Sequence, residues 1–289
     1  MKFLRTNNLF LLFTLAITLV LIGCSPEYIK NIKNKKVKSS KAPFVVIVDE
    51  NYTDKIDEEF IGDMYLDNSG IVNNCSYDEV MGNMLKEAKN NGANLIKINS
   101  QEPPSFFSSC HKINASFYYS DNPKKYEDEI IWLFDRKLEF DDFKAEVPND
   151  KTHIGAKASF GLFYEISQSS LFASTKIKVK AKFYCDKSWI KASSKNDNSL
   201  MRLQQLHFDI AELHARILRK KLKDKDLKFT NMEKAKVVFA EVMSKYNEMQ
   251  ERCDSETEWG MNEKKLSSWE SNIKDELYML DEYKDLLPF

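Results

Sequence analysis

The residues best able to do chemistry lie in one stretch, residues 200–220, which reads LMRLQQLHFDIAELHARILRK. In a helix with the pattern H-E-x-x-H, two histidines one turn apart hold Zn²⁺, and the glutamate takes a proton from the bound water. Here that frame holds Leu203, Gln204 and His207. Leucine cannot ligate a metal, and an amide cannot act as a base. The stretch therefore predicts no catalytic residue, no metal site of this kind and no cofactor.

The other histidines do not restore the site. The chain has His111, His153, His207 and His214. His207 and His214 are seven residues apart, which separates them by roughly 10 Å along a helix, too far to share one zinc ion. We interpret His207 as a hydrogen-bonded core histidine. The sequence also contains no G-x-S-x-G, P-loop or G-x-G-x-x-G motif.

The element that positions these residues is a long helix with one buried face. No glycine or proline interrupts residues 200–220, and Asn198 or Ser199 can cap the start. The residues at helical spacing on the expected buried face are Leu203, Leu206, His207, Ile210, His214 and Ile217.

This stretch resembles the signature of a bacterial family described as predicted secreted zinc-dependent proteases, common in Bacteroidetes, which reads approximately H-E-Q-x-H-F-D-I-x-E-x-x-A-R. The matching positions are Gln205, His207, Phe208, Asp209, Ile210, Glu212, Ala215 and Arg216. A second family block, T-x-H-G followed by a tryptophan, is similar to TEWG at residues 257–260 and Trp269. The resemblance implies that Trp259 replaces a histidine that would be the third ligand.

Two more blocks extend the resemblance over about residues 125–280. A block like W-x-D-F-K-G is similar to FDDFKA at residues 140–145, and K-S-W-V is similar to KSWI at residues 187–190. The scaffold positions match, and the chemical positions do not. The resemblance therefore implies a zincin-like domain without a protease site, an inactivated relative of active enzymes.

The first 23 residues have the features of a lipoprotein signal peptide. Lys2 and Arg5 make the start positive, and residues 9–22 form an apolar core too short for a comfortable membrane span. The sequence LIGC at residues 21–24 resembles a bacterial lipobox, which implies cleavage before Cys24 and its acylation with fatty acids such as palmitate. The alternative is an ordinary signal peptide with a chance cysteine. Two or three acyl chains anchor a protein stably. Ser25, rather than aspartate, then favours the outer membrane.

The composition is that of a globular protein with a substantial core. Of 289 residues, 43% are hydrophobic and 30% are charged, and the formal net charge is −1. This balance gives no footprint for nucleic acid. The partners we expect are the lipid bilayer, through acylated Cys24, and an envelope protein or peptide.

Four cysteines remain besides Cys24, an even number that suits an oxidising compartment. We favour the pairs Cys75–Cys110 and Cys185–Cys253, because each pair then lies within one expected domain. A four-cysteine zinc site is the alternative, but its ligands usually come in close pairs that are missing here.

We expect a lysine-rich tether at residues 24–42, a small α+β domain at residues 43–120 and the protease-like domain at residues 121–289. The tether lacks apolar periodicity, so it should be disordered or extended. It is interpreted as a solvated spacer; the alternative is a basic strip on anionic headgroups. The polar segment 121–125 marks the boundary between the two domains.

The small domain is expected to have the order ββαββ. An apolar run at residues 44–48, a strand near residues 60–66, a strand at residues 94–98 and a strand at residues 111–119 flank one helix. Ser76 and Glu79 form a capping box at the start of that helix, and Gly92 follows its end. Its expected buried face is Val80, Met81, Met84, Leu85 and Ala88.

The glycine, alanine and asparagine at positions 92–94, with Cys75 and Cys110, resemble small envelope lipoprotein domains of the Rcs stress-sensor type. Such domains bind or sense partners, and the motif itself is architectural. A helix cap that leads into a strand is the alternative interpretation of the same residues.

The larger domain is expected to be α+β, with strands followed by three helices. Residues 154–166 and 176–183 alternate as half-buried strands, and lysines occupy the outer face of the second. That lysine row is interpreted as a solvated face; the alternative is a grip on an acidic partner. Two further apolar stripes follow: Met232, Ala235, Val238, Phe239, Val242, Met243, Tyr246 and Met249, then Leu266, Trp269, Ile273 and Leu277.

These features together predict a lipid-anchored envelope protein with a non-catalytic binding, scaffolding or sensing role. The alternative is an active metal-dependent peptidase that uses other ligands. A stress-sensing role of the small domain would require one specific partner.

Overall fold

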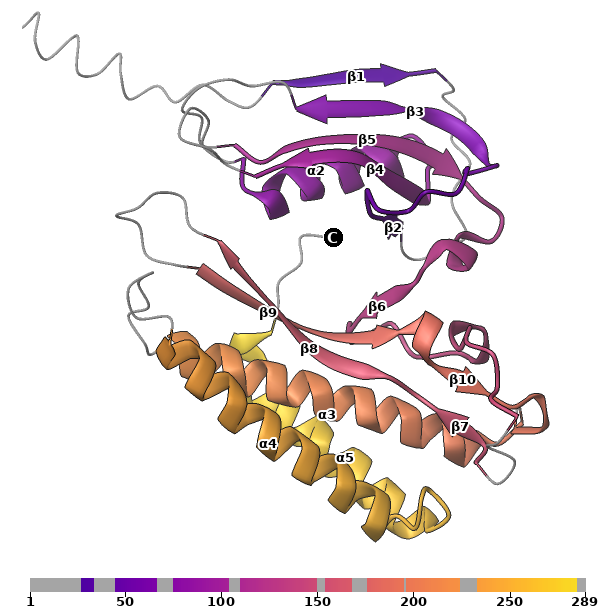
Figure 1. The fold of residues 1–289 in the computed structure, drawn as a ribbon, viewed down its shortest axis with the longest axis vertical. Helices are drawn as coiled ribbons and strands as arrows, with labels where there is room; N and C mark the ends of the chain where they lie inside the picture. The colour runs from indigo at the N-terminus through magenta and orange to yellow at the C-terminus, as the bar shows by residue number, and fades with distance from the viewer. Residues whose placement is uncertain are drawn as a thin grey trace, which may run out of the picture. The chain divides into compact units, whose positions relative to one another are not determined.

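The computed structural model describes residues 27–33, 45–66, 75–103, 110–149, 154–167, 176–194, 196–223 and 233–284. The predicted signal peptide, Cys24, Phe44, His153, Met232 and most of the predicted tether lie outside the described residues. The chain divides into two compact units, unit 1 (Met1–Pro123 with Leu287–Phe289) and unit 2 (Lys124–Leu286). Both units contain helix and sheet, which confirms the α+β class (Figure 1).

Unit 1 is a five-stranded sheet with one helix packed on it (Figure 1). The strands lie in the order β1-β3-β5-β4-β2, and every neighbouring pair is antiparallel except β2 with β4. Their bounds are β1 Tyr28–Ile32, β2 Val46–Val48, β3 Glu59–Leu66, β4 Leu95–Glu102 and β5 Lys112–Tyr119. The sheet and the helix enclose one hydrophobic core.

The helix of unit 1, α2 (Tyr77–Asn90), has the predicted start and the predicted buried face. Ser76 and Glu79 form the capping box, which satisfies backbone N–H groups at the first turn. Gly92 has φ of 80°, the left-handed conformation expected after a helix end. The buried residues are Val80, Met81, Met84, Leu85 and Ala88.

The expectation of a tether throughout residues 24–42 was wrong for its first part. Residues 28–32 form β1, an edge strand that pairs with β3 from Tyr28↔Leu66 to Ile32↔Gly62. Lys30 forms a 2.5 Å ion pair with Glu87 of α2. An edge strand with three exposed residues of five has no apolar periodicity, so the sequence pattern missed it. Unit 1 therefore has one strand more than the predicted ββαββ order.

Unit 2 has a three-stranded antiparallel sheet in the order β6-β9-β8, with strands β6 Glu129–Ile131, β8 Phe160–Ser167 and β9 Lys176–Tyr184. Val179, Ala181 and Phe183 are buried along β9, as its alternation predicted. The single strand expected at residues 154–166 is two strands: β7 (Ala156–Lys157) leaves the sheet to pair with β10 (Trp189–Ile190). Short 3₁₀ turns occur at Pro123–Tyr126, Phe140–Asp142, Cys185–Lys187, Ala192–Ser194 and Asp281–Tyr283.

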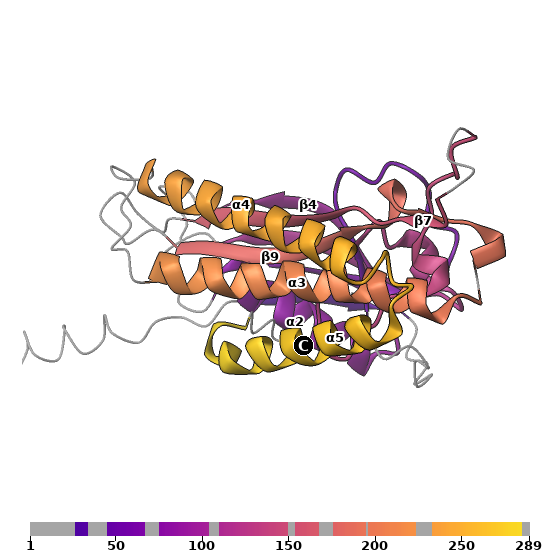
Figure 2. The same ribbon diagram turned by 90° about the horizontal axis from the view of Figure 1, so that it is seen from below.

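Three helices complete unit 2: α3 (Asn198–Lys223), α4 (Glu233–Glu256) and α5 (Glu263–Met279). The α3 helix packs on β8 and β9, and α4 and α5 each lie along α3, which passes between them in Figure 2. The N–H of Leu200 donates to Oδ1 of Asp197 at 3.0 Å, so Asp197 caps α3 instead of the predicted Asn198 or Ser199. The α5 residues Leu266, Trp269, Ile273 and Leu277 are buried, as predicted.

The cysteines follow the prediction in one pair and contradict it in the other. Cys75 and Cys110 form a disulfide. Cys185 and Cys253 are free and buried, so the predicted Cys185–Cys253 bond was wrong. An even number of cysteines says nothing about distance, and these two lie on different elements of the core. Burial raises the pKa of each thiol to about 12. No described helix is both long and apolar enough to span a bilayer.

Candidate functional site

The positions of the H-E-x-x-H frame lie at the start of α3 and are mostly inside unit 2. Leu203 is 2% exposed, and Gln204 is 5% exposed. The turn after α4 covers Leu203, because a Cβ placed on Gly260 would lie 3.4 Å from Leu203 Cβ. The structure therefore brings the two resembling blocks together through Gly260. The side chain of Trp259, in the position of the expected third ligand, is 68% exposed.

The turn that carries Trp259 has an unusual backbone. Glu258, Trp259 and Gly260 have φ angles of 53°, 57° and 86°, three left-handed residues in succession. The N–H of Trp259 donates to the carbonyl of Asp254 at 2.9 Å, and the fully buried Thr257 accepts the N–H of Asn262 at 2.9 Å. Thr257 also donates its hydroxyl to the carbonyl of Cys253 at 2.7 Å. These bonds hold the strained turn in place.

His207 lies at the α3–α4 contact beside a carboxylate. Its Nε2 is 2.8 Å from Oδ1 of Asp254, but the two atoms are not aligned as a hydrogen bond, and both are buried without another partner among the described residues. The Oε1 of Gln250 is likewise buried without a partner there, while its Nε2 donates to the carbonyl of His207 at 3.0 Å. The Nε2 of His207 therefore lacks the predicted hydrogen bond among the described residues.

The zinc ion that the family resemblance implies does not fit these residues. The frame supplies His207 as its single donor, and Asp254 is the one carboxylate that an ion pair places beside it. Within the described ranges, no group of three or more His, Cys, Asp and Glu side chains is arranged to hold a metal ion. Asp254 and Gln250 were missed by sequence analysis, because nothing in the α4 pattern reports which α3 residue they face.

The matching positions on α3 hold the fold together. The amide of Gln205 accepts the N–H of Leu138 at 2.9 Å and donates to Oδ1 of Asp209 at 2.8 Å. The indole of Trp132 donates to the same Asp209 oxygen at 2.7 Å. Burial raises the pKa of the Asp209 carboxyl. These bonds fasten the segment from β6 to residue 138 onto α3.

The next pair of matching residues ties α3 to other elements. Glu212, 3% exposed, accepts bonds at 2.9 Å from both Arg216 and Arg219. The Nη1 of Arg216 donates to the carbonyl of Leu277 at 2.7 Å, and the Nε of Arg219 donates to the carbonyl of Val179 at 2.8 Å. The helix is therefore bonded to α5 and to β9 through charged groups whose donors and acceptors are used inside the unit.

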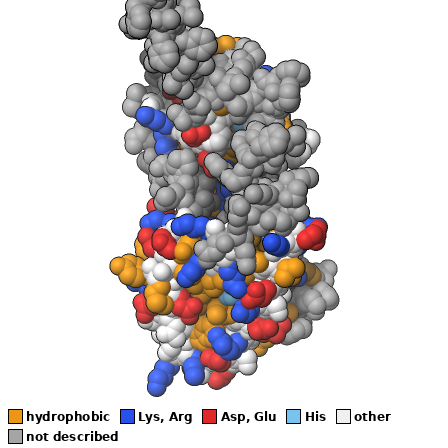
Figure 3. All heavy atoms as spheres, turned by 90° about the vertical axis from the view of Figure 1, so that its left-hand side faces the viewer, with side chains coloured by type: hydrophobic (Ala, Val, Ile, Leu, Met, Phe, Trp, Pro, Cys, Tyr) orange, Lys and Arg blue, Asp and Glu red, His pale blue; other side chains and the backbone are white. Residues whose placement is uncertain are grey.

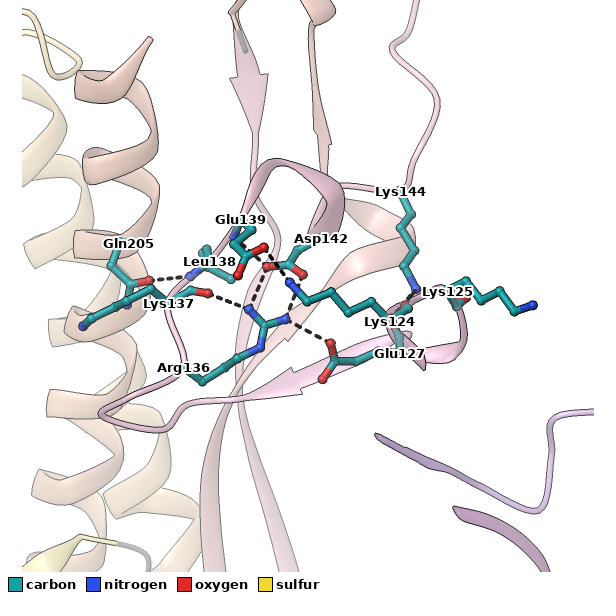
Figure 4. Close-up of polar contacts among 10 residues, drawn as sticks. All are labelled: Lys124, Lys125, Glu127, Arg136, Lys137, Leu138, Glu139, Asp142, Lys144 and Gln205. Carbon is teal, nitrogen blue, oxygen red and sulfur yellow. Dashed lines mark hydrogen bonds and ion pairs between the residues drawn. The ribbon is translucent and has the colours of Figure 1, made fainter. Parts of the chain in front are cut away.

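The block at residues 140–145 has a similar internal role (Figure 4). Arg136 binds the carboxylate of Asp142 with two hydrogen bonds, at 2.8 and 3.0 Å, and binds Glu127 at 3.0 Å. Burial alone would lower the pKa of Arg136, but Asp142 and Glu127 raise it above its ordinary value. Burial also raises the pKa of Glu127. The ammonium group of Lys144 donates to the carbonyls of Lys124, Lys125 and Glu127.

The block at residues 187–190 is also structural. The hydroxyl of Ser188 accepts the N–H of Ser159 at 2.9 Å and donates to the carbonyl of Tyr184 at 2.6 Å. Trp189 is 4% exposed. These resembling positions therefore make structural contacts inside unit 2.

A surface groove of about 480 Å³ lies between α4 and α5. Its apolar residues are Met249, Trp269 and Ile273, and the guanidinium of Arg252 lies 5.1 Å from the centre of the Trp269 ring. Charges of both signs also line it: Lys264 and Lys265, and Glu256 and Glu276. Figure 3 shows hydrophobic side chains gathered in the lower half of one face, with charged side chains around them.

No match was found for this chain in comparisons with protein-family models, characterised proteins and solved structures.

Proposed function

We propose that this chain is an envelope lipoprotein, anchored through Cys24, whose second unit is a non-catalytic relative of zinc-dependent proteases with a binding or scaffolding role. The outer membrane is the proposed location. In this proposal the protease-like helix is retained because it organises the unit, and the role of the protein is to hold a protein or peptide partner at the membrane.

One observation carries the proposal: core side chains occupy the first two positions of the H-E-x-x-H frame. Leu203 and Gln204 are buried, and Gly260 packs on Leu203. Restoring a histidine at position 203 would place a polar ring in a space that is now apolar and closed, which costs free energy unless the ring finds partners. The loss of the first ligand is therefore accompanied by a packed substitute.

The groove between α4 and α5 supports a binding role. It combines apolar side chains with two lysines and two glutamates. Binding pockets of this kind provide apolar area together with a few polar groups that set orientation. A peptide with an apolar side chain and charged neighbours of both signs suits these walls.

Metal content tests the proposal. Residues 25–289 would be prepared as an oxidised protein and dialysed, and zinc would be measured by mass spectrometry. We expect far less than one zinc per chain. One zinc per chain that is lost on His207→Ala, but kept in the control His214→Gln, would overturn the non-catalytic reading.

The second candidate is a metal-dependent hydrolase with other ligands, and the contact of His207 with Asp254 favours it. These two buried atoms make no hydrogen bond among the described residues, although two donors alone do not make a zinc site. In that case Asp254→Asn and His207→Ala would each abolish zinc binding and peptide hydrolysis. Peptide cleavage by the parent that neither variant affects would exclude this site.

A further inference from the structure

The first ordered strand begins very close to the proposed lipid anchor. Residue 28 starts β1, and β1 pairs with β3 over five residues. The Nδ2 of Asn83 donates to the hydroxyl of Tyr28 at 2.8 Å, and Lys30 pairs with Glu87. Tyr28 is therefore fixed to the body of unit 1 by its strand and by α2.

Covalent geometry then limits how far unit 1 can be from the anchor. Four residue steps join the Cα atoms of Cys24 and Tyr28, and a fully extended chain spans at most ~14 Å over that length. A tether that ran to residue 42 would have reached roughly 65 Å. Residues 34–44 follow β1 and lead back to β2 of the same unit, so they add nothing to the reach.

Strand register identifies which end of unit 1 this short connection holds. Tyr28 lies opposite Leu66, at the last residue of β3, and Tyr65 lies opposite Asn114 near the start of β5. Glu102, the last residue of β4, lies opposite Lys112. The Cys75–Cys110 disulfide is at the same end, because the N–H of His111 donates to the carbonyl of Cys75 directly before β5.

We propose that unit 1 sits directly on the lipid surface, with the end that carries the Cys75–Cys110 disulfide facing the headgroups. The inference rests on the acylation of Cys24 in the proposed function and adds an orientation to it. The partner of this end is the bilayer itself. The opposite end of the sheet, where β4 begins at Leu95, lies ~23 Å farther away, at 3.3 Å per residue over the length of β4.

Two labelling positions report this orientation. Glu102→Cys places a thiol at the disulfide end, where the Glu102 side chain is 73% exposed. Lys89→Cys places one on the exposed last turn of α2, which leads to the opposite end. The native Cys185 and Cys253 are buried, so a thiol-reactive nitroxide will label the introduced cysteine selectively.

The test uses the full acylated chain in phosphatidylcholine vesicles that contain a nickel-chelating lipid. Nickel at the surface speeds the relaxation of a nearby nitroxide, and the effect falls steeply with distance. We expect relaxation at least about threefold faster for the label on Glu102→Cys than for the label on Lys89→Cys. A flexible insertion of twenty glycine and serine residues after Ser25 should remove the difference.

Mass spectrometry of Cys24 separates the two possible failures. A chain without acyl groups would overturn both the anchoring in the proposed function and this orientation. An acylated chain with equal relaxation at the two labels, or with a difference that survives the inserted linker, would overturn the orientation alone.

Discussion

The two sides of α3 differ in how their polar groups are satisfied. On the side of residues 132–144, Gln205, Asp209 and the Arg136–Asp142 pair are bonded to one another or to backbone. On the side of α4, the facing atoms of His207, Gln250 and Asp254 are buried without hydrogen bonds among the described residues. The first side is a bonded network except at the Nε of Arg136, which is also buried without a hydrogen bond among the described residues, and the second side has three such atoms.

This difference distinguishes polar groups that stabilise the fold from polar groups that a ligand could use. A buried network that is fully bonded contributes stability, and loss of one member leaves the others unsatisfied. An unsatisfied cluster contributes little stability, so removing a member has a small effect unless a ligand uses it. The fluorescence of the protein can test this directly, because all four tryptophans lie in unit 2: Trp132, Trp189, Trp259 and Trp269.

The largest effect should come from Asp142→Ala in the bonded network. Asp142 is 1% exposed, and its loss leaves the charge of Arg136 buried with Glu127 alone. We expect unit 2 to lose about 3–5 kcal/mol of unfolding free energy, measured by tryptophan fluorescence in urea. The control Glu139→Ala removes an exposed ion pair with Lys124 and should cost about 1 kcal/mol or less. Similar costs for both variants would contradict the assignment of Asp142 to a bonded network.

Two glutamines provide a matched comparison across α3. Gln205→Ala leaves the N–H of Leu138 without its partner and should cost about 1–3 kcal/mol. Gln250→Ala removes an amide that bonds the carbonyl of His207 and the side chain of Tyr246, while its Oε1 is unbonded, and should cost less than about 1 kcal/mol. The same urea titration measures both variants. A larger loss for Gln250→Ala would reverse the assignment of the two sides.

A substitution at Gly260 tests whether the packing of Gly260 on Leu203 is rigid, although other atoms on the α4 side of α3 are unbonded. Gly260→Ala adds a Cβ at φ of 86° and 3.4 Å from Leu203, so it should cost about 1–2 kcal/mol. Met261→Ala in the same turn is the control, because Met261 is 78% exposed and its loss should change stability by about 0.5 kcal/mol or less. Thermal unfolding followed by fluorescence measures both variants. Equal melting temperatures for the two variants would show that the turn changes conformation to accommodate the added Cβ.

The smallest expected effect is on the loss of stability at acidic pH. Burial lowers the pKa of His214 from 6.5, and the nearby Lys245 lowers it further. The unfolded chain therefore takes up this proton first, and its contribution to stability is present above pH 6.5 and is lost as the pH falls below it. His214→Gln should flatten the fall in stability between pH 7 and 5. An unchanged slope would show that other groups control this range.

The sequence predicted elements whose signals are local. The α2 helix has its capping box, α5 has its four-residue stripe, and β9 has strict alternation, so each was predicted before the fold was known. The β1 strand was missed because an exposed edge strand is stabilised by the backbone of β3, which leaves no apolar pattern. The cap of α3 was one residue away from the expected pair, at Asp197.

The residue types of the candidate site could be predicted from the sequence, but the contacts between those residues could not. The sequence alone shows that Leu203 cannot ligate a metal and that Gln204 cannot act as a base. Asp254 on α4 lies beside His207 on α3 although the two residues are 47 positions apart in the chain, and no local sequence pattern predicts this contact. The free state of Cys185 and Cys253 likewise depends on three-dimensional distance and not on the number of cysteines.

The two buried thiols have a consequence for biogenesis. Before it folds, an exported chain would expose four thiols to oxidants, yet it needs only the bond between Cys75 and Cys110. Wrong pairings with Cys185 or Cys253 would trap the second unit in an unfolded form, since both side chains must enter its core. Secretion should therefore require either rapid burial of these thiols or an isomerase. A Cys185→Ala, Cys253→Ala chain would be exported in higher yield from cells without that isomerase, and an unchanged yield would show that burial is fast enough.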